Sequence, residues 1–194
     1  MKVIFLDNDG VICLANNWGS RHKKQTKWGK RKLSMSATSI PVEYRFDDFD
    51  QKAIKVLNSI LEETGAEIVV SSDWRLFANL DELKEYYLSQ GIIKGPVGVT
   101  KKLGEFEEPV DFPWSRNWDL EQSRSLEIKQ YLLDHPEITN WVAVDDLDMG
   151  INGKHYSVEF THDWGLENFV HTPLSNEGIK QSFVKEKILL YLSK

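Results

Sequence analysis

The chain has 194 residues, of which 41% are hydrophobic and 11% aromatic, so its composition excludes bulk disorder and fits one ordinary domain. It contains no run of eighteen apolar residues and turns acidic early, so we expect no membrane span and no secretory signal. The net charge of -6 is uneven, because residues 21–32 hold seven of the 24 lysines and arginines and no acidic residue. The single cysteine, Cys13, excludes an internal disulfide, and we expect a reducing, cytoplasmic setting.

Three short apolar runs predict strands that are buried on both faces. They are rich in β-branched residues and do not alternate with polar ones, which is typical of a parallel sheet. The runs are Val3–Leu6, Ile68–Val70 and Trp141–Val144. Weaker strand signals lie at Ile92–Ile93 and Phe169–Val170.

Apolar residues at helical spacing predict helices between these strands. The stripes cover Phe49–Leu61, Leu80–Tyr87, Ile128–Leu132 and Ile179–Tyr191. Gly65 suits the end of the first helix. Strands alternating with helices predict an α/β domain with right-handed crossovers.

Two segments lack this periodicity. Residues 13–46 carry the basic run and read as a flap or small insert after the first strand. Residues 101–122 contain two prolines and two tryptophans and read as an ordered loop. A loop of this length is usually functional or mobile.

The three strongest strands all end in polar residues. The first is followed by Asp7, Asp9 and Gly10, the second by Ser71 and Ser72, and the third by Asp145 and Asp146. The carboxyl ends of parallel strands meet at one edge of a sheet, which is where ligands bind. Crowded carboxylates are tolerable when a hard cation such as Mg²⁺ lies between them, and Mg²⁺ in turn favours a phosphate ligand. An Asp-x-Asp-Gly sequence alone is equally compatible with an ordinary turn.

The motifs FLDNDG, VVSSDWR and VAVDD, in that order, resemble motifs I, II and IV of the haloacid dehalogenase (HAD) superfamily of phosphotransferases. Leu57–Arg75 and Arg124–Asp146 are similar to the HAD domain of Swiss-army-knife RNA-repair proteins, with its Ser-Ser-x-Trp-Arg and Arg-x-x-Glu-Ile signatures. The likeness covers most of the chain outside residues 13–46 and 101–120. It implies a single HAD-like domain over 1–194, a three-layer sandwich around a mainly parallel, Rossmann-like sheet, with 13–46 as a small cap.

The resemblance also implies roles for the strand-end residues. Asp7 becomes the nucleophile and Asp9 the general acid and base. Mg²⁺ is held by Asp7, by the backbone carbonyl of Asp9 and by Asp145, with Asp146 as a further ligand or acceptor. Two serines contact the phosphoryl group: Ser71 by resemblance and Ser72 by adjacency. Gly10 permits the turn that exposes these groups.

The basic residue of motif III is ambiguous in the sequence. The branch pattern favours Arg124, with Lys129 and the pair Lys101–Lys102 as alternatives that also fit solvated surface. Arg75 either contacts substrate phosphate or pairs with a structural carboxylate. For Trp74 we expect packing in the core in preference to stacking on a nucleic-acid base.

These expectations combine into a Mg²⁺-dependent phosphatase that hydrolyses a phosphomonoester, with a nucleotide or nucleic-acid end as candidate substrate. Two alternatives stay open: a phosphotransferase of the same superfamily, and an RNA-binding module with little turnover. Residues 21–32, with Trp18 and Trp28 nearby, are either a nucleic-acid contact or a solvated flap.

Overall fold

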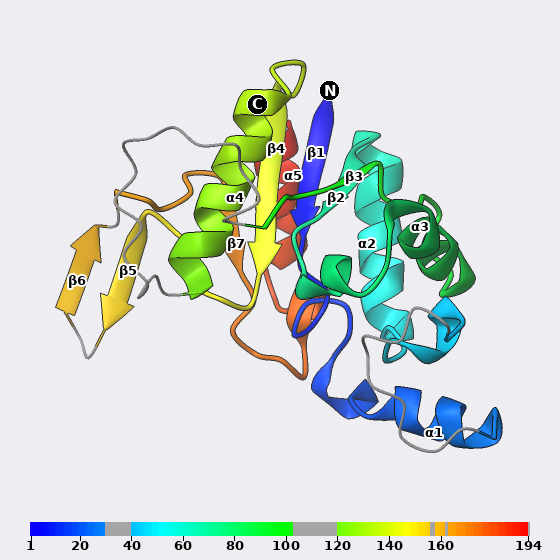
Figure 1. Cartoon of the computed structure of the whole chain (residues 1–194). Coiled ribbons are helices and arrows are strands. Elements are labelled where there is room, and N and C mark those ends of the chain that lie inside the picture. The colour runs from blue at the N-terminus through cyan, green and yellow to red at the C-terminus, as the bar shows by residue number, and fades with distance from the viewer. Residues whose placement is uncertain (30–39, 103–119, 156–157, 162, 194) are drawn as a thin grey trace.

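Five parallel strands form the central sheet, in the order β3-β2-β1-β4-β7 (Figure 1). The coordinates are a computed structural model, and it describes residues 1–29, 40–102, 120–155, 158–161 and 163–193. The strands of the sheet are β1 (Lys2–Leu6), β2 (Glu67–Val70), β3 (Gly98–Val99), β4 (Asn140–Asp145) and β7 (Phe169–His171). The predicted parallel sheet is therefore confirmed.

Both faces of the sheet are covered, which explains why its strands do not alternate in polarity. In β1, Ile4 and Leu6 join one buried cluster, whereas Val3 and Phe5 join another on the opposite face. Each layer of apolar side chains therefore needs helices above it.

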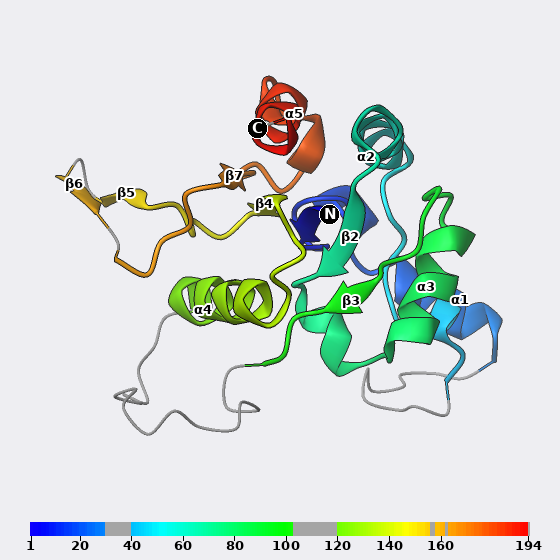
Figure 2. The ribbon, with the colours of Figure 1, turned by 90° about the horizontal axis from the view of Figure 1, so that it is seen from above.

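The helices supply these two outer layers (Figure 2). α2 and α5 cover one face and α4 covers the other, while α3 lies on the β3 side of the molecule. Their bounds are α2 (Gln51–Thr64), α3 (Leu80–Ser89), α4 (Leu120–Asp134) and α5 (Val184–Leu192). The result is the predicted three-layer α/β sandwich.

Local signals set the ends of α2 and α3. The Asp50 side chain accepts hydrogen bonds from the backbone N–H groups of Lys52 and Ala53, and Gly65 ends α2 in the left-handed region. Asn79 and Glu82 form a reciprocal capping box at the start of α3.

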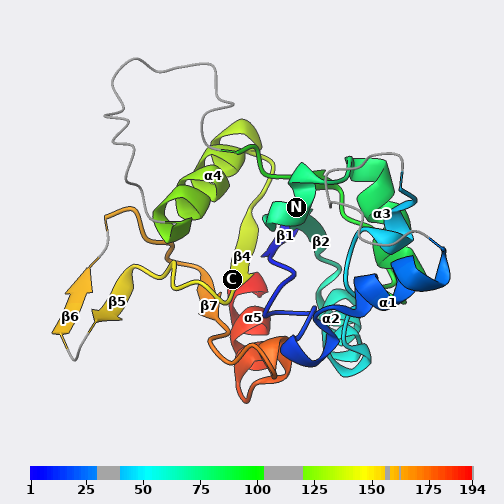
Figure 3. The ribbon, with the colours of Figure 1, turned by 60° about the horizontal axis from the view of Figure 1, so that its bottom comes forward.

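The segment between β1 and α2 contains α1 (Ser20–Lys27) and two 3-10 turns, over Ala15–Asn17 and Val42–Tyr44. α1 lies beyond the carboxyl ends of β1 and β4 (Figure 1) and next to α3 when that end is brought forward (Figure 3). Residues 30–39 of the predicted insert lie outside the described residues.

Two predictions of secondary structure are corrected. Ile92–Ile93 is not a strand: it lies in the irregular segment after the turn at Gly91, and the edge strand β3 comes later. Ile179 lies in a separate 3-10 turn (Gly178–Lys180), because Phe183 adopts a positive φ of 67° and α5 begins only after it.

The structure also contains a two-stranded antiparallel hairpin that the sequence did not signal, β5 (Asn152–His155) with β6 (Val158–Thr161). Of the predicted loop 101–122, residues 103–119 lie outside the described residues, and 120–122 belong to α4. Among the described helices, none has the length and apolar character needed to cross a membrane.

Candidate active site at the carboxyl ends of β1 and β4

The chain order reverses at β1, which creates a switch point in the sheet. From β1 the chain adds β2 and β3 on one side and later β4 and β7 on the other. Open α/β sheets bind ligands at such a point, beyond the carboxyl ends of the strands. Asp7 follows β1 there, and Asp145 is the last residue of β4.

Three carboxylates converge at this point. Asp7, Asp145 and Asp146 each offer an oxygen, and these oxygens lie within 4.8 Å of one another. Burial raises the pKa of Asp7 well above its ordinary value, and Asp145 raises it further. Burial and Asp145 likewise raise the pKa of Asp146 to about 6. The three carboxyl groups are therefore too close together, and too far from water, to ionise easily at the same time.

Arg124 of α4 bridges two of these acids. Its Nη1 donates to Asp7 Oδ1 and to Asp145 Oδ2, both at 2.9 Å, and its Nη2 lies 3.6 Å from Asp73 Oδ1. Burial lowers the pKa of Arg124, but Asp7 and Asp145 outweigh that effect and keep the guanidinium charged. Arg124, the residue favoured for motif III, therefore lies among the acids.

Gly10 lets Asp146 approach the loop after β1. It has a φ of 74°, and a Cβ at this position would lie 2.2 Å from Asp146 Oδ2. Only glycine combines this backbone conformation with such a close approach. Gly10 thus shapes the acid cluster through the space it leaves.

The two serines after β2 have different surroundings. Ser71 is buried, and its hydroxyl has no hydrogen-bond partner among the described residues. The Ser72 hydroxyl accepts a 3.4 Å hydrogen bond from the Trp74 backbone N–H and caps the 3-10 turn Asp73–Leu76. Ser71 is therefore the serine with unused bonding capacity at this strand end.

Arg75 pairs with a structural carboxylate, the second of the two alternatives that the sequence left open. Its Nη2 donates to Glu127 Oε2 at 2.5 Å, and its Nη1 donates to the Ser71 carbonyl oxygen. Both charged side chains are buried. This pair ties the segment after β2 to α4 near Arg124.

Lys129 lies farther along α4 than Arg124. Its ammonium group donates to the Asp163 carbonyl oxygen at 3.4 Å, beside a separate pocket that Trp141 and Ile151 help to line. Lys101 lines another pocket with Tyr131 and His135. Neither lysine is among the described residues that contact the three acids.

The Asp9 carboxylate is not one of the three clustered carboxylates and has hydrogen-bond partners of its own. Its Oδ2 accepts a 2.8 Å hydrogen bond from the indole Nε1 of Trp74, and the Cys13 thiol hydrogen-bonds it as well. Although Asp9 is exposed as a residue, desolvation of its carboxyl raises its pKa, against the effect of these hydrogen bonds.

Sequence reasoning missed two contacts that support this loop. Trp74 packs as expected, but its hydrogen bond to Asp9 was not foreseen, although it stands in the Ser-Ser-x-Trp-Arg signature. Tyr87 of α3 donates a 2.5 Å hydrogen bond to Asn8 Oδ1, and Asn8 is buried between the two acids. The Tyr87 contact joins residues far apart in the chain, so no local signal announced it.

Comparison with known proteins adds one finding to this geometry. A family model described as "HAD domain in Swiss Army Knife RNA repair proteins" matches residues 3–175. No curated protein and no solved structure matches the chain. The matched range covers the sheet except for Lys2 and includes the whole acid cluster, so the chain belongs to the family of HAD domains found in Swiss Army Knife RNA repair proteins, among the HAD-type phosphatases.

Proposed function

We propose that the chain is a Mg²⁺-dependent phosphatase that hydrolyses a phosphomonoester through an aspartyl-phosphate at Asp7. The observation that carries this proposal is the convergence of Asp7 and Asp145 on one guanidinium, with Asp146 in reach, at the switch point of the sheet. Family membership supports the reaction class.

The acid cluster fits a hard divalent cation. It offers carboxylate oxygens, which Mg²⁺ prefers, and its crowded negative charge is only partly balanced by Arg124. Asp7, Asp145 and Asp146 would hold the ion, together with the backbone carbonyl of Asp9. When bound, Mg²⁺ offsets the charge of these carboxylates and of the phosphoryl oxygens.

In the first step, a carboxylate oxygen of Asp7 attacks phosphorus. The bond between phosphorus and Asp7 forms while the bond from phosphorus to the ester oxygen breaks, and Asp9 gives its proton to the departing oxygen. Arg124 balances negative charge on Asp7 and the phosphoryl group. The free hydroxyl of Ser71 donates to a phosphoryl oxygen.

In the second step, water attacks the phosphorus of the aspartyl-phosphate. Asp9, now ionised, takes a proton from the water, and the bond from phosphorus to Asp7 breaks. Inorganic phosphate leaves, and both carboxyl groups return to their starting states. The raised pKa of Asp9 suits a group that must hold a proton in one step and accept one in the next.

We propose that residues 13–46 act as the small cap and select a nucleotide or nucleic-acid end as substrate. Lys23 and Lys27 of α1 are exposed, whereas Lys24 is neutralised by Asp48 at 2.7 Å. α1 lies next to α3 (Figure 3), and its Arg21 is close enough to Asp9 to offset part of the rise in pKa that desolvation gives that carboxyl. Exposed lysines near a phosphate site favour an anionic polymer or nucleotide.

The test is Asp7→Asn, assayed for phosphate release from p-nitrophenyl phosphate and from 5′- and 3′-phosphorylated oligonucleotides in Mg²⁺. We expect turnover to fall by at least about a thousandfold, since the nucleophile is lost. Asp81→Asn is the matched control, because the Asp81 side chain is 92% exposed on α3. Turnover by Asp7→Asn close to that of the parent would contradict the nucleophile.

The same assay distinguishes the alternatives. Phosphate transfer to an added alcohol, in place of release, would identify a phosphotransferase. Salt-dependent RNA binding that survives Asp7→Asn, in a parent protein without turnover, would identify a binding module.

A further inference from the structure

The general acid and base of the proposed mechanism poses a positioning problem. An aspartate side chain has several staggered conformations, and the carboxyl of Asp9 takes a different position in each of them. Proton transfer to a departing oxygen works well only when the carboxyl is held within hydrogen-bond reach in the right orientation. Something in the protein must therefore restrict the Asp9 side chain without covering it.

Two side chains hold the Asp9 carboxyl by hydrogen bonds: the Cys13 thiol and, from a buried position, the indole of Trp74. The indole Nε1 lies 2.8 Å from Asp9 Oδ2, while Trp74 itself is only 4% exposed. An indole N–H is a donor only and cannot compete for the proton that Asp9 must carry. The contact thus orients one carboxyl oxygen and leaves the carboxyl able to exchange its proton.

Three aromatic rings fix the indole in turn, and we call them the aromatic clamp: Phe46, Phe49 and Tyr86. Phe46 stacks on Trp74 with ring centroids 4.3 Å apart and planes 6° apart, and Phe49 stacks at 5.3 Å. Tyr86 meets the indole edge-on at 5.8 Å. Such packing leaves the indole little freedom to turn away from Asp9.

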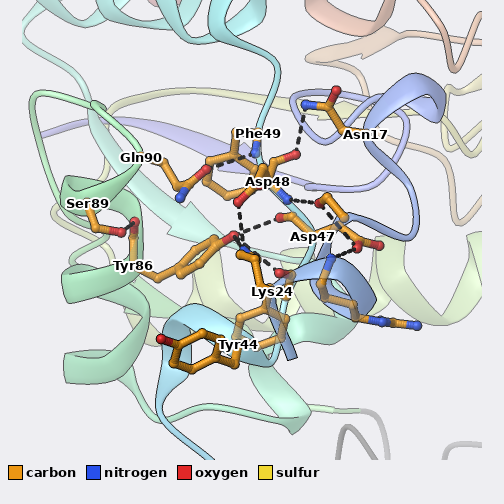
Figure 4. Close-up of polar contacts among 12 residues, drawn as sticks. Asn17, Lys24, Tyr44, Asp47, Asp48, Phe49, Tyr86, Ser89 and Gln90 are labelled. Carbon is orange, nitrogen blue, oxygen red and sulfur yellow. Dashed lines mark hydrogen bonds and ion pairs between the residues drawn. The ribbon is translucent and has the colours of Figure 1, made fainter. Parts of the chain in front are cut away.

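The clamp is continuous with the contacts that hold the insert in place (Figure 4). The Tyr86 hydroxyl donates to the Asp47 carbonyl oxygen at 2.8 Å, and Asp47 Oδ1 accepts from the Arg21 backbone N–H at 2.7 Å. Asp48 pairs with Lys24 of α1. One chain of contacts therefore runs from α1 through Tyr86 and Trp74 to Asp9.

We propose that Trp74 is a positioning residue that holds the Asp9 carboxyl for proton transfer, and that the aromatic clamp makes this position depend on the seating of the insert. The inference rests on the proposed function, in which Asp9 protonates the departing oxygen and later deprotonates water.

The first test is Trp74→Phe, which keeps a ring in the clamp and removes the N–H. p-Nitrophenolate departs without a proton, whereas the alkoxide of β-glycerol phosphate needs one. We expect kcat/KM for β-glycerol phosphate to fall about 10- to 100-fold more than that for p-nitrophenyl phosphate. We also expect a burst of p-nitrophenolate followed by slow turnover, because the second step needs Asp9 as a base.

Trp141→Phe is the matched control, since Trp141 packs edge-on against Phe5 in the other layer. This variant also replaces tryptophan by phenylalanine, and it should leave the ratio of the two kcat/KM values unchanged. An equal loss on both substrates in Trp74→Phe, without a burst, would overturn the positioning role and leave Trp74 as core packing.

Phe46→Leu tests the clamp separately, because it loosens the stack while the indole N–H remains. We expect kcat/KM for β-glycerol phosphate again to fall more than that for p-nitrophenyl phosphate, but with a smaller difference than in Trp74→Phe. An equal loss on both substrates would overturn the link to the insert.

A readout that needs no activity separates this inference from the proposed function. The chain has seven tryptophans, and Trp74→Phe identifies the indole N–H signal of Trp74 in a ¹⁵N spectrum. Asp9→Ala should shift that signal more than any other indole signal. An unmoved signal would overturn the inference even in an active enzyme, whereas a parent without phosphatase activity would overturn the proposed function and not the contact.

Discussion

At the switch point, the fold holds like-charged carboxyl groups close together, although their mutual repulsion and their burial both oppose this. Asp7 and Asp145 are both buried, and both have raised pKa values because burial disfavours their ionised forms. Arg124 offsets part of this cost through hydrogen bonds to both. Such an arrangement is unfavourable for stability and suited to a ligand that brings positive charge.

The first prediction concerns Gly10→Ala. The new Cβ would meet Asp146 Oδ2 at 2.2 Å, so we expect Asp146 to be displaced and phosphatase activity to be lost. The residue also adopts a left-handed conformation, which costs about 1–2 kcal/mol of stability for alanine.

Gly65→Ala provides the control for this variant. Gly65 has a similar φ of 69°, and no atom lies within 4 Å of its added Cβ. Chemical denaturation should show a loss of stability in both variants, larger in Gly10→Ala because of the contact with Asp146, and kinetics should show a loss of activity in Gly10→Ala alone. Equal activities would contradict the role of Gly10 in shaping the acid cluster.

Among the elements, α3 is the part that connects the insert to the sheet. Glu82 serves two purposes there: it completes the capping box with Asn79, and its carboxylate binds Arg45 of the insert at 2.6 Å. The Arg45 side chain is buried. Loss of the Glu82 carboxylate would leave the buried Arg45 cation without this ion pair.

We predict that Glu82→Gln lowers the free energy of unfolding by about 2 kcal/mol at pH 7, because glutamine can still cap α3 but no longer carries the charge that faces Arg45. Asp81→Asn, an exposed neighbour on the same helix, should change it little. Urea denaturation measures both.

The effect of Glu82→Gln depends on pH in a defined direction. Arg45 lowers the pKa of Glu82, so the folded state keeps this carboxylate ionised at pH values where the unfolded chain protonates it. The stability it contributes is complete above the ordinary glutamate pKa of about 4.3 and is lost as pH falls through the lowered value. The difference between parent and Glu82→Gln should therefore shrink below about pH 4.3; a constant difference would contradict the ion pair.

At the scale of the whole molecule, the order of the strands decides where function lies. The two central strands, β1 and β4, deliver Asp7 and Asp145 to one edge, while α4 brings Arg124 across the face of the sheet to the same place. No two of these three side chains are close in sequence. A ligand that binds them all should stabilise the complete fold.

We predict that saturating Mg²⁺ raises the melting temperature of the parent protein by about 5–10 °C relative to chelator. A ligand at 100 times its Kd stabilises the folded state by about 2.7 kcal/mol, and a domain of this size shifts by about 2–4 °C per kcal/mol. Asp145→Asn and Asp146→Asn should reduce the shift, whereas Asp81→Asn should retain it. A shift that survives in both site variants would place the ion elsewhere.

The last prediction concerns the charge of α1. Lys23→Glu with Lys27→Glu should raise the KM for a phosphorylated oligonucleotide about tenfold at low salt and leave that for p-nitrophenyl phosphate unchanged, since only the polymer reaches α1. The control is Lys52→Glu with Lys55→Glu on the exposed face of α2. Equal effects of both pairs would show that net charge alone is responsible.

Local sequence patterns were enough to predict the layers of the fold and the main acids of the site. Apolar runs as short as Val3–Leu6 are strands only when both faces are buried, and the carboxyl ends of parallel strands must meet, so the approach of Asp7 to Asp145 followed from local pattern. The Arg124 position followed from resemblance to a known motif.

The partners of the polar side chains, in contrast, depend on how distant elements pack together. Arg75 pairs with Glu127 because α4 packs against the segment after β2, and Trp74 reaches Asp9 because the insert folds back over it. These contacts join residues about 50 to 65 positions apart. Periodicity reports which face of an element is buried, whereas side-chain partners depend on how the elements pack in three dimensions.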